Sequence, residues 1–525
     1  MAENRIGIGA DGIGTVSTPF RLQHEDARPC VDLMGGTEAM RRAAYIPRKE
    51  RESDRAYSIR VNRTVLRNAF AQTIGYYRGQ VFSREIALDS ESSALTDEQM
   101  AWFARWAEDV DMRGHNLTSW SGNVFAAGLV SGVTFALVDF PSVETVEEGG
   151  QTFYRARDGA LRPRTEGAAK AEGWRPYLVH IPAAQVLDCR AEWRGGRRVI
   201  THFRYVETRY EASATAPGTL EEVCYVRAYW PGHWELWRGT GGFSGGHVGA
   251  TGVTGGDFVK VSEGRLTVDE IPLAVFMPGD LRTDFTARPA LMDLAWLNIR
   301  HWQATCEQSD LLAYVRLPVW TVTGAEREIG PDGNPIPVPL GPGNLLYLQQ
   351  GGSVQSVGVD PASVEAGRQD LRDIEDAMAT YGLQIMQAQS AARMTATEVE
   401  KMSREGNSQL KNWALDFKDF LENVLRLVAR WQGMEDGPSA QVNDDYADTA
   451  SLDYLTQLYD KGVLSRETLA AFAVRLGVLP DDFNYDEEVA RRARDAASDG
   501  IGGPSLGASL AQRFGVGGGS WMYRG

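Results

Sequence analysis

The sequence predicts an α+β fold in which long helices flank a β-rich middle region. Apolar residues recur every three or four positions over 289–311, 361–386 and 395–432, as in amphipathic helices. Between residues 174 and 280 they alternate instead, in segments rich in β-branched and aromatic side chains. A chain of 525 residues also exceeds what one hydrophobic core accommodates, so we expect about two to four domains.

The N-terminal region combines a predicted arm with two predicted helices. Residues 1–36 are rich in glycine and polar residues, have no sustained period, and are interpreted as an arm. Thr96 and Gln99 make a capping box, which predicts the start of a helix. A second helix is predicted from Leu117 to Ser131, and a strand follows it.

The middle region is predicted to form antiparallel strands. The glycine-rich segment 239–257 separates two of them and is interpreted as a long hairpin loop. The order of the strands in a sheet does not follow from the sequence. The predicted strands cover 133–140, 176–181, 198–210, 221–230, 233–238 and 271–279.

Two predicted helices, 286–316 and 361–386, are separated by a segment that excludes helix. Six prolines lie between residues 317 and 342, so short strands and turns are expected over 317–360. A segment this short and this rich in proline does not build a core of its own. We therefore expect a helical hairpin whose tip projects.

The C-terminal third is predicted to be helical. After a break at 387–394, Thr395 and Glu398 make a second capping box, and the helix that they begin is expected to reach about residue 432. Shorter helices are expected over 441–495, and the glycine-containing tail 496–525 is expected to be flexible.

The net negative charge argues against tight binding of nucleic acid by the whole surface. The formal net charge is −16, whereas proteins that bind many phosphates are usually basic. Loose contact with DNA remains open. Residues 41–84 hold eleven Lys or Arg and three acids, and 441–488 hold eleven acids and three bases. The basic stretch is interpreted as a solvated or interface face in preference to a nucleic-acid site.

Motifs of familiar enzymes are missing from the sequence. The G-x-G-x-x-G match at 7–12 follows no predicted strand, and no phosphate-binding loop, H-E-x-x-H or G-x-S-x-G occurs. We therefore expect no enzyme, no cofactor and no metal, and the sequence also shows no signal peptide and no membrane span. The cysteines lack metal-ligand spacing and indicate a reducing compartment: Cys30, Cys189, Cys224 and Cys306.

Several short strings occur in an order that resembles one protein family. R-P-A-L-M-D-L-A-W-L-N-I-R-H-W begins at Arg288, D-L-R-D-I-E-D-A-M-A-T-Y-G at Asp370 and T-A-T-E-V at Thr395. In matching order stand the strings at 45–57, 175–188, 317–324 and 341–348. Their order and spacing over roughly 40–435 resemble the portal proteins of tailed bacteriophages, which are head–tail connectors.

The resemblance implies a portal-type fold that assembles as a closed ring of about twelve copies at one capsid vertex. Double-stranded DNA would pass through this ring during packaging and ejection, and the protein would occur in the virion and, during assembly, in the host cytoplasm. The implied parts are a wing (37–285), two stem helices (286–316 and 361–386), a clip (317–360), a tunnel loop with a long wing helix (387–440) and a crown (441–495).

The resemblance also implies partners and candidate site residues. The clip would bind the large terminase and later a head–tail adaptor, and the wing would face the major capsid protein; no membrane is involved. An acidic stem would repel DNA evenly and leave it free to slide. Candidates for the channel lining are Arg368, Arg372, Asp373, Asp376, Gln387, Gln389 and Arg393, and those for docking on the clip are Glu326, Arg327, Asp332 and Asn334.

Two other interpretations stay open at this point. One is another structural protein of the virion, such as a minor head protein, which needs no ring of fixed symmetry. The other is a soluble, monomeric enzyme with an unrecognised site in the region 174–280.

Overall fold

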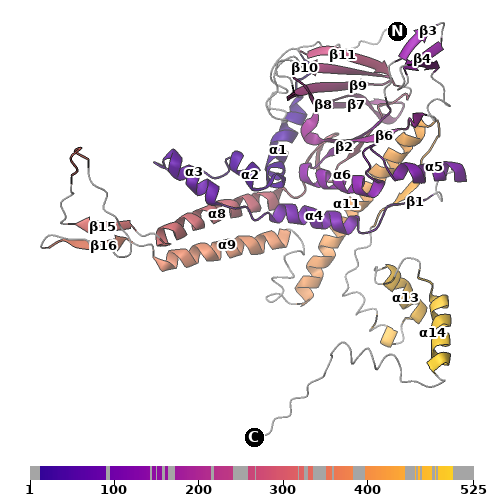
Figure 1. Ribbon diagram of the computed structural model, residues 1–525. Coiled ribbons are helices and arrows are strands. Elements are labelled where there is room, and N and C mark those ends of the chain that lie inside the picture. The colour runs from indigo at the N-terminus through magenta and orange to yellow at the C-terminus, as the bar shows by residue number, and fades with distance from the viewer. Residues whose placement is uncertain are drawn as a thin grey trace. The chain divides into compact units, whose positions relative to one another are not determined.

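A computed structural model describes most of the chain, which divides into two compact units, Met1–Asp444 and Asp445–Gly525. In the first unit the described residues are 12–443 without 90–94, 142–144, 149–150, 156–159, 164–171, 214–217, 240–257, 267, 317–318, 324–328, 335–350, 358–359 and 382–395. In the second unit they are 456, 459–461, 464–475, 479 and 483–499. Helices and strands both occur throughout the first unit, so the predicted α+β class is confirmed (Figure 1).

The first helix, α1 (Thr18–Met34), occupies about half of the predicted arm 1–36, and the prediction of an arm was wrong for these residues. Its buried side chains include Phe20, Cys30 and Leu33. The buried amide of Gln23 donates to the carbonyl of Ser131 (2.6 Å) and accepts from the backbone N–H of Ala287 (2.8 Å). Distant partners therefore hold α1, whose buried residues recur at helical spacing.

Five further helices follow α1. Thr96 accepts from the backbone of Gln99, whose side chain accepts in return, so the predicted capping box is confirmed. Helix α6 spans Leu117–Ser131, as predicted, and ends at Gly132 with φ +81°. The other helices are α2 (Gly36–Arg42), α3 (Asp54–Arg63), α4 (Ala69–Val81) and α5 (Asp97–Ala107), and a short strand β1 (Ala87–Asp89) separates α4 from α5.

A three-stranded antiparallel sheet forms the centre of the first unit, in the order β12-β2-β6. It joins β2 (Thr134–Asp139), β6 (Tyr177–Pro182) and β12 (Leu273–Phe276), three segments far apart in the chain. Residues of β2 are almost entirely buried. This burial on both faces explains why the strand is a continuous apolar run.

A five-stranded antiparallel meander packs beside it, in the order β11-β10-β9-β8-β7 (Figure 1). Residue Gly239 pairs with Phe258, which confirms a hairpin at the predicted place, although 240–257 lie outside the described residues. The strands are β7 (Val186–Arg194), β8 (Arg197–Ala212), β9 (Leu220–Trp230), β10 (His233–Gly239) and β11 (Phe258–Arg265), and the turn η1 (Ala183–Gln185) precedes them. Smaller sheets comprise β3 (Thr145–Glu148), β4 (Gln151–Arg155) and β5 (Leu161–Pro163), and β13 (Asp280–Thr283) with β14 (Thr286–Arg288).

A helical hairpin follows, as predicted. Helix α8 (Met292–Arg316) and helix α9 (Pro361–Tyr381) lie side by side and extend away from the sheets (Figure 1). Between them, β15 (Val319–Thr323) and β16 (Ser353–Val357) pair as an antiparallel ribbon. The ribbon lies at the far end of the hairpin, so the expected projecting tip is present.

The long helix α11 (Ala396–Trp431) matches the predicted helix over 395–432. The side chains of its predicted capping box lie outside the described residues. Phe417 stacks edge-on against Phe82, Phe125 and Phe276, with ring centroids 5.0–5.6 Å apart. Beyond the helix, β17 (Ser439–Gln441) pairs with β1. These contacts fix α11 against the central sheet.

The second unit contains α13 (Arg466–Arg475) and α14 (Tyr485–Asp499). Helix α14 continues past residue 495 into the predicted flexible tail, and the rest of that tail lies outside the described residues. Among the helices of the described residues, none combines the length and the apolar character of a membrane span.

Replacing Asn298 with alanine is expected to destabilise the first unit by about 2 kcal/mol. Its fully buried side chain accepts from the backbone N–H of Phe70 (3.0 Å) and donates to the carbonyl of Arg67 (2.9 Å). The substitution leaves both backbone groups buried without these partners. Urea unfolding followed by tryptophan fluorescence measures the loss, and Asn62→Ala, which removes an exposed amide, is the control. Equal midpoints for the two variants would contradict the assigned role of Asn298.

Candidate functional site

The helical hairpin is the strongest candidate for a functional site because it carries the predicted stem residues on exposed positions. Ile374 and Met378 of α9 are buried against α8. The side-chain amide of Gln308 donates to the carbonyl of Val364 (3.0 Å). A Cβ atom at Gly367 would collide with the same Gln308 side chain, so glycine permits this close approach. The two helices therefore form one packed layer.

Polar contacts run along both sides of the seam between α8 and α9. On one side Arg300 pairs with Asp370, at 3.4 Å. On the other side the ring nitrogen Nε2 of His301 lies 3.2 Å from Glu375, which Arg67 also contacts. Burial lowers the pKa of His301, which favours a neutral ring at neutral pH. These contacts give the hairpin two distinguishable flanks.

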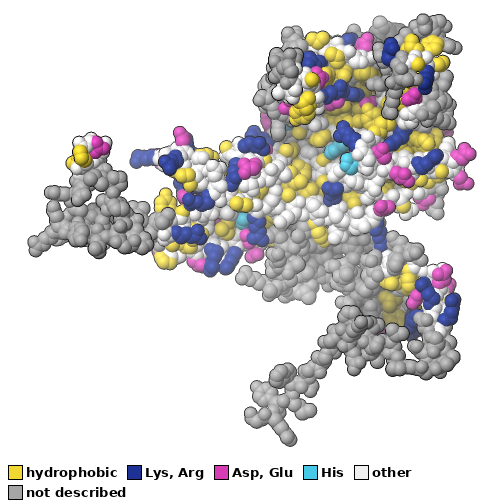
Figure 2. All heavy atoms as spheres, in the orientation of Figure 1, with side chains coloured by type: hydrophobic (Ala, Val, Ile, Leu, Met, Phe, Trp, Pro, Cys, Tyr) yellow, Lys and Arg dark blue, Asp and Glu magenta, His cyan; other side chains and the backbone are white. Residues whose placement is uncertain are grey.

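The exposed candidate residues of α9 point in different directions around the helix axis. At about 100° per residue, Asp376 points directly away from α8. Arg368 and Arg372 lie toward the flank of Glu375, whereas Asp373 lies toward the flank of Asp370. All four candidates are exposed. Figure 2 shows Lys and Arg side chains over α3, α8 and α9 with acidic side chains between them (Figure 2).

Of the eleven basic residues in the stretch 41–84, at least five form ion pairs within the chain. Lys49 contacts Asp310 of α8 at 2.5 Å. The side chain of Arg60 is only 4% exposed and binds Glu52, 8% exposed, through two hydrogen bonds of 2.7 and 2.8 Å. It thereby anchors α3 beside Cys306 of α8. Much of this positive charge has a structural role.

The remaining predicted residues divide between the described tip and undescribed segments. Asp332 accepts hydrogen bonds from the backbone (3.4 Å) and the side-chain amide (3.2 Å) of Asn334 in an exposed turn. The hydrogen bond from the Asn334 amide lowers the pKa of Asp332 below its usual value. Outside the described residues lie Glu326, Arg327, Gln387, Gln389 and Arg393.

A second place of interest is a polar hollow of about 280 Å³ between β6, α6 and the loop before α6. His115 pairs with Asp111 at 2.7 Å. His180 hydrogen-bonds Thr134 (2.8 Å), and burial lowers its pKa to about 4, so the imidazole is neutral at neutral pH. The described residues that line the hollow include no serine, threonine or cysteine.

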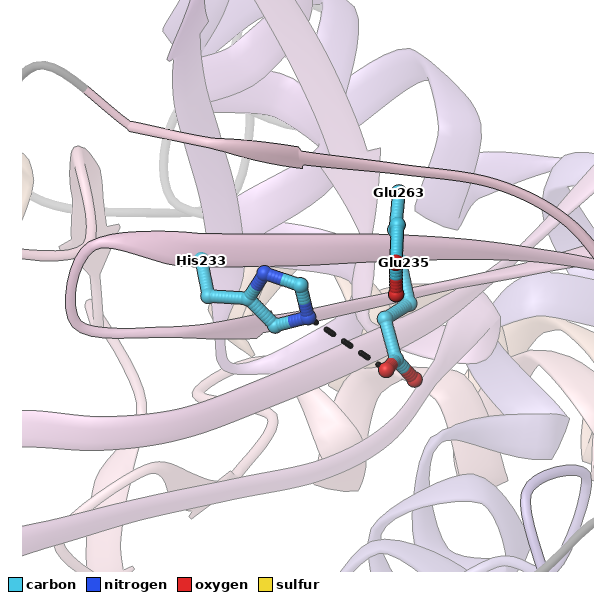
Figure 3. A group of neighbouring side chains, drawn as sticks. All are labelled: His233, Glu235 and Glu263. Carbon is cyan, nitrogen blue, oxygen red and sulfur yellow. Dashed lines mark hydrogen bonds and ion pairs between the residues drawn. The ribbon is translucent and has the colours of Figure 1, made fainter.

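A third group joins His233 and Glu235 of β10 with Glu263 of β11 (Figure 3). Nε2 of His233 lies 3.3 Å from Glu235. The ammonium of Lys260 contacts both carboxylates, at 3.5 Å for Glu235 and 2.7 Å for Glu263. A lysine in this position already offsets one of the two negative charges that would attract a cation. We interpret the group as an ion-pair network.

Part of the chain matches a family model, and several solved structures have some likeness to it. A family model described as a domain of unknown function (DUF4055) matches residues 290–432, which is α8 through α11. No curated protein matches the sequence. Solved structures with some likeness come from gene transfer agent particles.

A chain in the neck of an empty particle is 13% identical, with a TM-score of 0.37, over 78% of this chain and 90% of that chain. A chain in the neck of a native particle is 12% identical, with a TM-score of 0.36, over 78% and 89%. A chain in the virion of the native particle is 12% identical, with a TM-score of 0.38, over 83% and 98%. TM-scores this low do not establish a shared fold.

One exposed residue of the hairpin was missed by the sequence analysis. Trp296 lies on α8 and is 51% exposed. It falls outside the apolar stripe formed by Leu294, Ile299 and Trp302, all of which are buried. Trp296 could have been predicted to be exposed, because it is an aromatic residue outside the buried stripe of an amphipathic helix.

Proposed function

We propose that the protein is a structural component of a phage-type virion, specifically a portal protein that forms a ring around a DNA channel at one capsid vertex. The observation that carries the proposal is the packed α8–α9 hairpin, with a two-stranded tip and a charged outer face on α9. The ordered strings in the sequence support it independently. In this proposal the protein is not an enzyme and needs no cofactor or metal.

The dimensions of the hairpin suit a channel wall. Helix α8 has 25 residues and is about 38 Å long at ~1.5 Å rise per residue. In a ring, the face of α9 that carries Asp376 would turn toward the bore. Duplex DNA carries one phosphate charge per ~1.7 Å, so repeated carboxylates repel it from every side and keep it mobile. The tip around Asp332 would remain available for the terminase and then an adaptor, and the wing would contact the major capsid protein.

Replacing Asp376 with lysine is expected to slow DNA movement while leaving the ring intact. Each ring would place one cation per subunit where a carboxylate stood, and phosphate binding by counterion release would follow. Packaged DNA should then resist release, with a stronger dependence on salt than in the wild type. Assembled particles challenged at about 50 and 200 mM salt report this as the fraction of DNA ejected.

Asp499→Lys provides a control of equal charge change at the end of α14. Unchanged DNA release from particles that carry Asp376→Lys would contradict a channel-facing α9. Wild-type chains that stay monomeric at high concentration, also with capsid and scaffold proteins present, would contradict the portal proposal. A virion protein incorporated without a ring would favour a minor head protein.

A further inference from the structure

We propose that the two flanks of the hairpin bind each other in successive copies of this chain, with an acidic and aromatic flank of one copy against a basic flank of the next. The inference rests on the proposed ring and specifies which surfaces close it. The acidic and aromatic flank is defined by Trp296, Glu307 and Tyr314 of α8 and Asp373 of α9. The basic flank is defined by Arg368 and Arg372 of α9.

The acidic and aromatic flank exposes side chains that a monomer leaves uncovered. Trp296 is 51% and Tyr314 is 53% exposed, although both lie on a regular helix. Glu307 is exposed between them and makes no ion pair among the described residues. At 100° per residue these three positions share one stripe of α8, on the side where Arg300 meets Asp370. Exposed tryptophan and tyrosine are typical of protein interfaces.

The basic flank lies on the opposite side of the same hairpin. Arg368 is 57% exposed and pairs with Glu365 of its own helix. Arg372, one turn further along, is exposed and makes no ion pair among the described residues. Both arginines are rotated toward the side where Glu375 meets His301. Among the described residues, Glu307 and Asp373 thus make no ion pair on one side of the hairpin, and Arg372 makes none on the other.

This separation indicates that the partner bound by each flank is a second copy of the chain. Two different, complementary patches on opposite sides of one element make a head-to-tail contact, and such contacts form a ring when the rotation between copies closes. Among the described residues, no ion pair joins the two patches within one copy: Arg368 pairs with Glu365 instead. Arginine is also suited to both partners, since its guanidinium pairs with carboxylates and stacks on tryptophan.

The first experiment compares two exposed tryptophans in the full-length chain. Trp296→Ala is expected to raise the concentration at which half of the chains are assembled by about tenfold or more. Trp193→Ala, which removes a 71% exposed side chain from β7, is the matched control and should assemble like the wild type. Analytical ultracentrifugation over a concentration series gives both values. Equal loss in the two variants, or none in either, would overturn the assignment of the acidic and aromatic flank.

The second experiment reverses charge on one flank and then on both. Arg368→Glu with Arg372→Glu should weaken assembly by about tenfold or more, and adding Glu307→Arg on α8 should restore it. Because Glu307 makes no ion pair with Arg368 or Arg372 within one copy, restoration indicates a contact between copies. Arg55→Glu with Arg63→Glu on the exposed face of α3 is the control.

Different results would contradict the proposed interface and the proposed ring. Wild-type rings that tolerate every flank variant would overturn this interface while leaving the proposed ring intact. Wild-type chains that never assemble would overturn both. Circular dichroism of each variant separates loss of assembly from loss of folding, and a variant set that assembles poorly without restoration by the double reversal counts against the interface.

Discussion

A Gly132→Ala variant is expected to unfold with a free energy about 3 kcal/mol lower than that of the wild type. Gly132 ends α6 with φ +81°, a conformation that costs other residues about 1–2 kcal/mol. A Cβ atom there would also lie 2.5 Å from the carbonyl oxygen of Ala287 and 2.9 Å from the backbone of Arg288. The carbonyl of Gly132 accepts from Gly279 (3.1 Å), so the loop is held on both sides.

A Gly433→Ala variant separates the cost of the backbone conformation from the cost of the steric clash. Gly433 has a similar φ of +74°, but a Cβ atom there meets nothing within 4 Å. It should therefore cost only the conformational part, about 1 kcal/mol. Urea unfolding of both variants gives the difference. Equal losses would mean that the backbone near Ala287 yields, contrary to the packing described.

A Glu52→Gln variant is expected to lose about 3–5 kcal/mol of stability. The glutamine keeps the shape of the side chain but leaves the buried guanidinium of Arg60 without its carboxylate. The remaining partners of Arg60 are the carbonyl of Pro47 (2.9 Å) and the sulfur of Cys306 (3.5 Å), which carry no full negative charge. Asp54→Asn is the matched control, because Asp54 pairs with Arg48 but is 97% exposed. It should change stability by less than about 1 kcal/mol.

The same ion pair predicts a dependence on pH. The hydrogen bonds from Arg60 lower the pKa of Glu52 from 4.5 to about 2 in the folded protein. A depressed carboxyl pKa stabilises the fold above the unfolded value, and this contribution is lost as the pH falls from about 4.5 toward 2. Unfolding free energies of wild type and Glu52→Gln, measured across this range, should converge at the acidic end. Parallel curves would contradict the coupling.

The local sequence pattern was sufficient to predict an element where residues of that element and its caps determine its bounds. Helix α6 begins and ends as predicted because Asn116 caps it and Gly132 stops it. Helix α1 was missed although its buried residues recur at helical spacing, and Gln23 also ties it to residues 108 and 264 positions away. The order β12-β2-β6 depends in the same way on distant segments, which periodicity does not connect.

The candidate site was predictable as a set of residues but not as an arrangement. The charged face of α9 followed from spacing, and the structure confirms that Arg368, Arg372, Asp373 and Asp376 are exposed. Their division between two flanks required the rotation of α9 against α8, which Gly367 and the pairs at Asp370 and Glu375 determine. Whether they face DNA stays a prediction.

The pairing of β1 with β17 has a consequence for the order in which a new chain folds. Leu88 pairs with Ala440, so β1, in the N-terminal part of the first unit, can pair only after β17, near the end of this unit, has been synthesised. The sheets β12-β2-β6 and β11-β10-β9-β8-β7 leave the ribosome before α8, so they can form before the α8–α9 hairpin is complete. Strand β1, in contrast, has no partner until β17 has been synthesised. A chain halted before residue 439 would therefore leave the edge of β1 unpaired and open to pairing with another copy.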